Sequence, residues 1–182
     1  MARPDPATAL AEWRRQKDEF LARHPSSPIF GESVFSGLSY YPEDPAARVV
    51  ARVERTPLAA RVTLPTSSGD TQQFQEYGVA RFELDGQELA LTLFAGVHEP
   101  EGPRLFVPFT DATAGGETYG GGRYLDPRVE AAEPDRLLLD FNYAYHPYCA
   151  YAEGYSCAMP PPSNRLPVPV RAGERLPRPE EP

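Results

Sequence analysis

The stretch FQEYGVARFELDGQELALTLFAG, residues 74–96, carries the strongest structural signal in the sequence. Two runs rich in strand-forming residues flank Asp85-Gly86, a residue pair typical of the two-residue turn of a β-hairpin. Beyond that turn, every second residue is a leucine at Leu89, Leu91 and Leu93, which places the three side chains on one face of a strand. The stretch therefore predicts an antiparallel hairpin with one buried face.

Short stretches with the same alternation lie on both sides of the hairpin. In RVVARVE, residues 48–54, Val49, Ala51 and Val53 fall on one face and charged residues mostly on the other. Further short strands are expected in LAARVTL (58–64, with Ala60, Val62 and Leu64 on one face), RLFVPF (104–109), GRYLD (122–126), RLLLDFN (136–142) and LPVPVRAG (166–173). Because proline cannot donate a ladder hydrogen bond, we expect the strands with Pro108, Pro167 and Pro169 at edges or bulges.

The N-terminal residues predict a helix. The apolar residues of PDPATALAEWRRQKDEFLARHP recur at helical spacing, at Leu10, Trp13, Phe20 and Leu21. Asp5 can serve as the N-cap with Pro6 at the first helical position, and Pro25 ends the helix after His24. This apolar stripe is expected to pack on the rest of the protein.

These elements predict a mostly β protein in a single domain, an antiparallel β-barrel or sandwich with the N-terminal α-helix packed on it. The 182 residues suit one domain with a full core. We expect residues 1–25 to form the helix, 26–174 the β part of the same domain, and the polar, proline-rich residues 175–182 a flexible tail.

The charge and hydropathy of the chain bound its partners. The formal net charge is −8, which argues against binding to nucleic acid or to an anionic membrane surface. No apolar run approaches the ~18 residues of a membrane span, and the N-terminus lacks the apolar core of a signal peptide. We therefore expect a cytoplasmic protein without nucleic-acid or membrane partners.

Tyrosines concentrate in the second half of the chain, where polar residues also gather. Seven of the ten tyrosines lie between Tyr119 and Tyr155. Either they form a packing layer at one edge of the β domain, or they line a ligand pocket with a few convergent charges. The candidate ligand-binding residues are Asp111, Glu117, Tyr119, Arg123, Tyr124, Asp140, Asn142 and Arg165.

A glycine-rich loop precedes one of these arginines. Five glycines fall between Gly115 and Gly122, directly before Arg123. Such a loop can present backbone N–H groups to a phosphate, but the GK[ST] ending of a phosphate-binding loop is missing. A bulge or a turn that requires glycine is the plainer interpretation.

The stretch FNYAYHPYCAYAEGYSC, residues 141–157, contains both cysteines of the chain. Cys149 and Cys157 could form a disulfide, which in the chain-entropy model would contribute about 2.5 kcal/mol, or remain two reduced, packed thiols. A zinc site with His146 is a weaker interpretation, because the spacing does not match the usual ligand pattern. We expect no metal and no cofactor, and the disulfide stays open.

The same stretch offers the pieces of a hydrolase. His146 could act as a base beside Cys149, with Asp140 a few residues away. A pair of carboxylates, Asp111 or Glu117 with Asp140, is a second arrangement. No GxSxG or HExxH motif occurs in the sequence, so whether the protein is an enzyme stays undecided.

Four blocks of the chain resemble the bacterial and archaeal family called domain of unknown function 1684. They are GLSYYPEDPAARVVARVE, LFVPFTDATAGGETYGGGRYL, LDFNYAYHPYCAYAEGYSC and PPPSNRLPVPVRAGE, and together they extend from Gly37 to Glu174. At the position of His146 the family more often has asparagine, which argues against a catalytic role for this histidine. The resemblance implies no known activity, cofactor or catalytic residue.

Three classes of function remain. The first is a binding domain for a small polar or anionic ligand, held by Arg123 and Arg165 between tyrosine walls. The second is a hydrolase-like enzyme that uses carboxylates or the cysteine–histidine stretch. The third is a structural or interaction protein whose tyrosine-rich face contacts a partner or a second copy, so that both a monomer and a homodimer are compatible with the sequence.

Overall fold

The structure, a computed structural model, describes residues 5–31, 35–56, 60–97, 104–130, 132–133 and 135–177. Its α-helix is α1 (Pro6–Arg23), and its strands are β1 (Ser39–Tyr40), β2 (Arg48–Arg55), β3 (Arg61–Pro65), β4 (Thr71–Leu84), β5 (Gln87–Gly96), β6 (Val107–Phe109), β7 (Arg123–Leu125), β8 (Arg136–Asp140) and β9 (Glu174–Arg175). Short 3-10 turns are η1 (Pro45–Ala47), η2 (Phe141–Tyr143), η3 (Tyr148–Ala150) and η4 (Pro162–Asn164). The protein is mostly β with one N-terminal helix, as expected.

The predicted hairpin is confirmed as β4 and β5. The two strands pair from Phe74↔Gly96 to Leu84↔Gln87, and the connecting Asp85 and Gly86 have φ of 51° and 72°. Positive φ at both central positions is the signature of a type I′ turn, whose twist matches that of the strands. The three leucines at 89, 91 and 93 are buried in the main core, so the predicted inner face is also correct.

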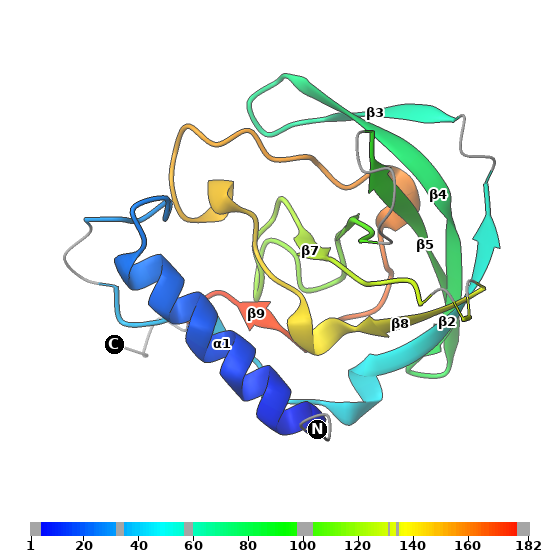
Figure 1. Cartoon of the computed structure of the whole chain (residues 1–182), viewed down its shortest axis with the longest axis horizontal. Coiled ribbons are helices and arrows are strands. Elements are labelled where there is room, and N and C mark those ends of the chain that lie inside the picture. Colours follow the sequence, from blue (N-terminus) through cyan, green and yellow to red (C-terminus); the bar gives the residue numbers. More distant parts are fainter. Residues whose placement is uncertain are drawn as a thin grey trace.

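The large sheet is built around β4. Along one edge β4 pairs with β3 through residues 71–75 and with β2 through residues 78–81, and β5 occupies the other edge. Strand β8 extends the sheet beyond β2. In the described residues, β1–β9 and β6–β7 form two separate two-stranded sheets, so the sheets do not close into a barrel and the expected barrel or sandwich is not confirmed. Figure 1 shows β7 and β9 between α1 on one side and β3, β4 and β5 on the other.

A β-bulge between Glu76 and Gly78 lies where β4 changes partner from β3 to β2. At Gly78 the two backbones approach so closely that a Cβ atom would lie 2.3 Å from the carbonyl oxygen of Glu54. Only glycine fits at such an approach without a shift of the backbone.

Replacing Gly78 with alanine is expected to lower the free energy of unfolding by about 1–3 kcal/mol, the range for inserting an atom into a packed site. Urea unfolding followed by circular dichroism measures the loss. Gly116→Ala is the matched control, because an added Cβ there would lie 3.8 Å from the Thr113 carbonyl oxygen, at ordinary contact distance. Equal stability of the two variants would contradict the assigned role of Gly78.

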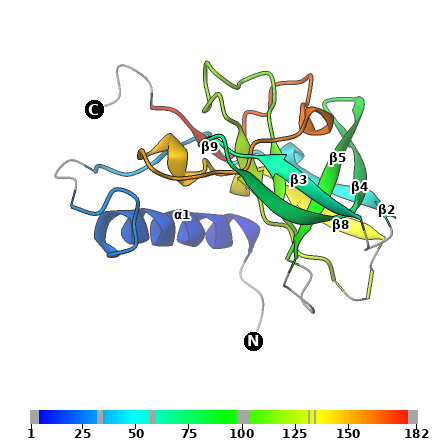
Figure 2. The same ribbon diagram turned by 90° about the horizontal axis from the view of Figure 1, so that it is seen from above.

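Helix α1 begins and ends as predicted. The side chain of Asp5 accepts a hydrogen bond from the Thr8 N–H, and His24 is the C-cap. Leu10 and Leu21 are buried, and the Trp13 ring packs edge-on against Tyr143 at 5.1 Å. The helix therefore docks through its apolar stripe; in the turned view of Figure 2 it lies below β9 and to the left of the large sheet.

The C-terminal stretch LPVPVRAG is extended but is not assigned as a strand, contrary to the prediction. Its alternating residues Leu166, Val168, Val170 and Ala172 are buried, so the periodicity was interpreted correctly. The intervening prolines cannot donate to a ladder, and only scattered backbone hydrogen bonds form, such as Leu166 N–H to the Thr110 carbonyl oxygen at 2.8 Å.

Ordered chain continues beyond residue 174. Strand β9 pairs with β1 through Ser39↔Arg175 and Tyr40↔Glu174, and the Leu176 N–H donates to the Glu117 carbonyl oxygen at 2.8 Å. Of the expected flexible tail, residues 178–182 lie outside the described residues, as do residues 58–59 of the predicted strand 58–64.

Candidate functional site

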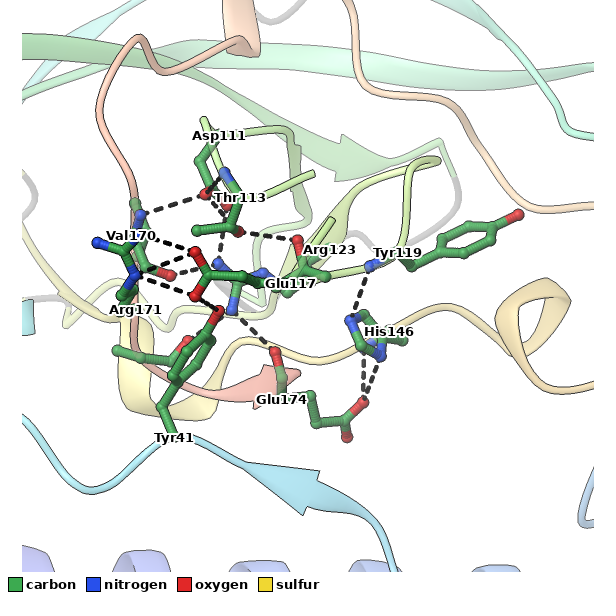
Figure 3. A network of polar contacts seen from close by, with 12 residues as sticks. Tyr41, Asp111, Thr113, Glu117, Tyr119, Arg123, His146, Val170, Arg171 and Glu174 are labelled. Atoms are coloured by element: carbon green, nitrogen blue, oxygen red, sulfur yellow. Dashed lines mark hydrogen bonds and ion pairs between the residues drawn. The ribbon is translucent and has the colours of Figure 1, made fainter. Parts of the chain in front are cut away.

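Arg123 of β7 and Asp111, which follows β6, form a buried ion pair. Their side chains are 1% and 2% exposed, and Nη2 of Arg123 lies 2.8 Å from Oδ2 of Asp111. The guanidinium also donates to the carbonyl oxygens of Val170 (2.7 Å), Ala172 (2.5 Å) and Glu174 (3.0 Å). Figure 3 shows this convergence on the C-terminal segment. The hydrogen bonds of the guanidinium thus hold the C-terminal segment, residues 170–174, next to β7.

The second oxygen of Asp111 is also engaged by the protein. Its Oδ1 accepts hydrogen bonds from the Thr113 N–H (2.8 Å), the Thr113 hydroxyl (2.6 Å) and the Val170 N–H (3.2 Å). Both side chains of the ion pair are therefore almost fully buried, and their polar atoms are used mainly by bonds within the protein.

The glycine-rich loop packs tightly against this unit. Gly122 has a φ of +95°, and a Cβ atom there would lie 2.6 Å from the Phe109 carbonyl oxygen and 2.7 Å from Pro160. At this position glycine serves a backbone turn and a close approach. Glu117, in the same loop, binds the guanidinium of Arg171 through both carboxylate oxygens. Its carboxylate also accepts a hydrogen bond from the Tyr41 hydroxyl at 3.0 Å.

A second charged pair is buried where the helix meets the C-terminal segment. Lys17 of α1 forms an ion pair with Glu174 of β9, with side chains 15% and 1% exposed. The Glu174 carboxylate also accepts the Tyr151 hydroxyl and the backbone N–H of His146 at 2.8 Å. Burial lowers the pKa of Lys17, and the charge of Glu174 opposes that shift.

His146 lies within this network and is not placed to act as a base. Its Nε2 accepts a hydrogen bond from the Tyr119 N–H at 3.3 Å, and its Nδ1 lies 3.6 Å from the Glu174 carboxylate. Burial, and then the nearby charge of Arg123, lower its pKa to about 3. The ring is therefore neutral and its lone pair is occupied, so the geometry does not support a cysteine–histidine mechanism.

This buried histidine predicts a loss of stability in mild acid. The unfolded chain takes up a proton near pH 6.5 and the folded one only near pH 3. The stability linked to this difference is therefore complete above pH 6.5 and is lost as the pH falls, by about 1.4 kcal/mol per pH unit. Urea unfolding of the wild type between pH 7 and pH 5 is expected to show this slope, and His146→Asn is expected to reduce it.

His24→Asn is the control for that experiment, because the His24 side chain is exposed at the end of α1. This variant is expected to leave the slope of stability against pH unchanged. The measurement stops at pH 5 so that carboxylates contribute little. An unaltered slope in His146→Asn would show that His146 titrates normally.

The remaining predicted residues lie elsewhere. Asp140 pairs with Arg48 at 2.7 Å and caps η2 through the Asn142 N–H. The buried Asn142 bonds the backbone of Asp44 through both ends of its amide. Arg165 is exposed and lines a hollow of about 500 Å³ together with Asp111 and Leu166 among others. With Asp140 so engaged, the carboxylate pairs are not arranged for catalysis, and the two arginines do not meet in one accessible site.

One cavity does have the expected tyrosine walls. Its volume is about 430 Å³, and it is lined by Gln72, Phe74, Phe106, Tyr124, Tyr145, Pro147, Tyr148, Tyr155, Ser156, Cys157 and Ala158. We call it the aromatic cavity. Of the candidate ligand-binding residues, Tyr124 alone lines it.

The rings of the aromatic cavity contact one another. Phe74 stacks on Phe106 at 5.2 Å, Phe106 packs edge-on against Tyr124 at 4.7 Å, and Tyr124 against Tyr145 at 5.7 Å. The Tyr124 hydroxyl donates to the Ala158 carbonyl oxygen at 2.6 Å, and the Tyr145 hydroxyl to Asp126 at 2.9 Å. This wall is therefore held in place by hydrogen bonds from its polar tips.

The opposite wall is more accessible. Tyr148 and Tyr155 are each 37% exposed and pack edge-on at 5.4 Å. Between them the chain also forms part of a second hollow of about 380 Å³, which reaches His146, Tyr151 and Glu174. The cysteine stretch is thus the shared wall of two hollows.

Both cysteines are free thiols in the structure. The sulfur of Cys157 accepts a hydrogen bond from the Cys149 N–H at 3.3 Å, and the Tyr119 hydroxyl lies 3.7 Å from the sulfur of Cys149. Burial raises the pKa of Cys157 to about 11. Cys157 is thus a lining residue of the aromatic cavity, and the disulfide stays a prediction.

Sequence reasoning missed Lys17 and the two phenylalanines of the cavity. Lys17 is the only lysine in the sequence and lies seven residues after Leu10, within the apolar stripe of the helix; that position was a usable signal. Phe74 and Phe106 come from separate segments, and nothing local places them beside Tyr124.

Within the described residues, no group of three or more His, Cys, Asp or Glu side chains is arranged to hold a metal ion. In the same part of the chain, the helices include none with the length and apolar character to cross a membrane.

Comparison with known proteins gives a family and a structural relative. The family model described as protein of unknown function (DUF1684) matches residues 33–175. The solution NMR structure of an uncharacterized protein from gene locus rrnAC0354 of Haloarcula marismortui is 42% identical, with a TM-score of 0.74 over 94% of each chain. No curated protein matches.

Proposed function

The chain belongs to the DUF1684 family, and we propose a function for it from its own geometry: the protein binds a small organic molecule in the aromatic cavity. The observation that carries this proposal is the lining of six aromatic rings around about 430 Å³. Ligand sites in proteins are typically hollows of about 300–1,000 Å³ with mainly apolar and aromatic walls and a few polar groups.

The construction of the cavity also supports binding. One wall is fixed from behind by the hydrogen bonds of Tyr124 and Tyr145, so little ordering is needed when a ligand enters. The other wall offers Tyr148 and Tyr155, whose rings are partly exposed. Partly exposed aromatic side chains beside a hollow are a common feature of binding surfaces.

The lining favours this function over a site for an anionic ligand and over a hydrolase. An anionic ligand in this cavity would need an accessible cation there, whereas none of the described residues that line it is charged. A hydrolase would need a free base, and the Nε2 of His146 already accepts a backbone hydrogen bond.

A fragment screen tests the proposal. Ligand-observed NMR with small, neutral aromatic and alicyclic fragments is expected to give hits that weaken about tenfold or more in the double variant Tyr148→Ala/Tyr155→Ala, because aromatic contacts of about 0.5–1.5 kcal/mol each are lost. Both residues are partly exposed, so the fold should be retained.

The matched control is Phe30→Ala, which removes an exposed aromatic ring (56% exposed) that does not line the cavity. Hits that survive in the double variant, or that are lost equally in the control, would show that binding occurs elsewhere.

A further inference from the structure

Resting on the proposed function, we infer that the preferred ligand of the aromatic cavity is a bulky organic cation of the quaternary ammonium class. Rings approach one another edge-to-face around the hollow, at 77° for Phe106–Tyr124, 88° for Tyr124–Tyr145 and 80° for Tyr148–Tyr155. Ring faces set at right angles can surround a rounded cation on several sides. Such cages of aromatic rings recognise methylated ammonium groups through cation–π attraction.

The charge around the cavity has the matching sign. Among the described residues, none of those that line the cavity is charged, and the whole chain carries a formal net charge of −8. An acidic protein raises the local concentration of cations and repels anions. Asp126 accepts a hydrogen bond from the Tyr145 hydroxyl at 2.9 Å, which places an acidic group at the polar tip of that ring.

Two positive groups lie near this wall: Arg104, whose charge acts on Asp126 and on Tyr145, and Lys17, which is paired. The Lys17 ammonium is 4.6 Å from the centre of the Tyr145 ring, and Glu174 neutralises it. Tyr145 therefore already binds a cation of the protein itself, and the rings left for a ligand are those of Tyr124, Tyr148 and Tyr155 with the two phenylalanines.

The polar groups of the lining argue against a sugar or another hydroxyl-rich ligand. The Gln72 amide donates to the Ser156 carbonyl oxygen at 3.1 Å, and the Ser156 hydroxyl is bonded to Ser68 and Thr66. These side chains already form hydrogen bonds within the protein, whereas a quaternary ammonium group needs no hydrogen-bond partner. Its cost of leaving water is also low compared with that of a primary ammonium, because its charge is spread over methyl groups.

Titration with choline and with its neutral tert-butyl analogue separates charge from shape. The two compounds have nearly the same size, and the spectra of protein with isotope-labelled tyrosine report on the cavity rings. At constant ionic strength held with potassium chloride, choline is expected to bind about tenfold more tightly than the analogue, the ratio that corresponds to a cation–π contribution of about 1.4 kcal/mol.

Variants locate the effect. Tyr148→Leu and Tyr155→Leu are each expected to weaken choline binding several-fold, whereas Tyr148→Phe, which keeps the ring, is expected to retain most of it. Phe30→Leu should have no effect.

Each outcome decides the inference. Equal affinity for choline and the neutral analogue, or neutral aromatic hits in the fragment screen without choline binding, would overturn the cation preference and leave the proposed small-molecule function standing. If neither choline nor any fragment shifts the tyrosine signals, both fail. Choline binding that is unchanged in Tyr148→Leu and Tyr155→Leu would also overturn the inference, because the cage would not be the site.

Discussion

Replacing Arg123 with methionine is expected to lower the free energy of unfolding by about 3–5 kcal/mol, the typical cost of breaking a buried ion pair from one side. The variant leaves the Asp111 carboxylate buried without its countercharge, since that side chain is 2% exposed. It also removes the donors to the carbonyl oxygens of Val170, Ala172 and Glu174. Methionine keeps the apolar part of the side chain beside Phe109, so most of the loss is polar.

Such a loss is a large part of the stability of a domain, which is typically about 5–15 kcal/mol. Urea unfolding at pH 7 measures it, and Arg136→Met is the control, because Arg136 is 57% exposed and only loosely paired with Glu133 at 3.8 Å. Adding Asp111→Asn to Arg123→Met should restore part of the stability by removing the stranded charge. A loss below about 1 kcal/mol in Arg123→Met, the range of exposed pairs, would contradict the structural role.

The fold was predictable where the signal is local. The turn residues Asp85-Gly86, the alternation of β2 and the capping of α1 by Asp5 each fix a short segment through its own backbone and burial preferences. The order of strands around β4 depends instead on pairings between distant segments, such as β2 with β8. The alternation of apolar residues and the residues of the turns predict where strands lie, but not which strands pair. This is why the predicted barrel was not confirmed.

The site was predictable in composition but not in arrangement. The tyrosine-rich half of the chain does supply rings to the aromatic cavity. Arg123 was proposed as a ligand residue because it lies among the tyrosines and polar residues of the second half of the chain, yet it donates to carbonyl groups 47 to 51 residues further along. A charged residue looks the same in the sequence whether it faces solvent or fastens a distant segment, because its partner is set by the tertiary fold.

The Lys17–Glu174 pair gives the second large effect. Lys17→Met is expected to lower the free energy of unfolding by about 3–5 kcal/mol, because Glu174 is then left as an unpaired charge in a site where it is 1% exposed. The partners that remain, the Tyr151 hydroxyl and the His146 N–H, are neutral donors and cannot replace the ammonium. Methionine suits the apolar stripe of α1 and keeps the unbranched apolar stem of the side chain; the ammonium that it removes lies 5.5 Å from the centre of the Trp13 ring.

The double variant Lys17→Met/Glu174→Gln separates the charge from the packing. Glutamine is nearly the same size as glutamate and carries no charge, so the double variant is expected to be more stable than Lys17→Met alone, with a coupling of about 0.5–3 kcal/mol in the cycle. Arg15→Met is the control on the exposed side of α1, where Arg15 is 61% exposed and pairs with Glu12 and Glu19. If the losses of the single variants Lys17→Met and Glu174→Gln simply add in the double variant, the ion pair is not what holds α1 to β9, and the docking of the helix must come from its other contacts, such as those of Leu10, Trp13 and Leu21.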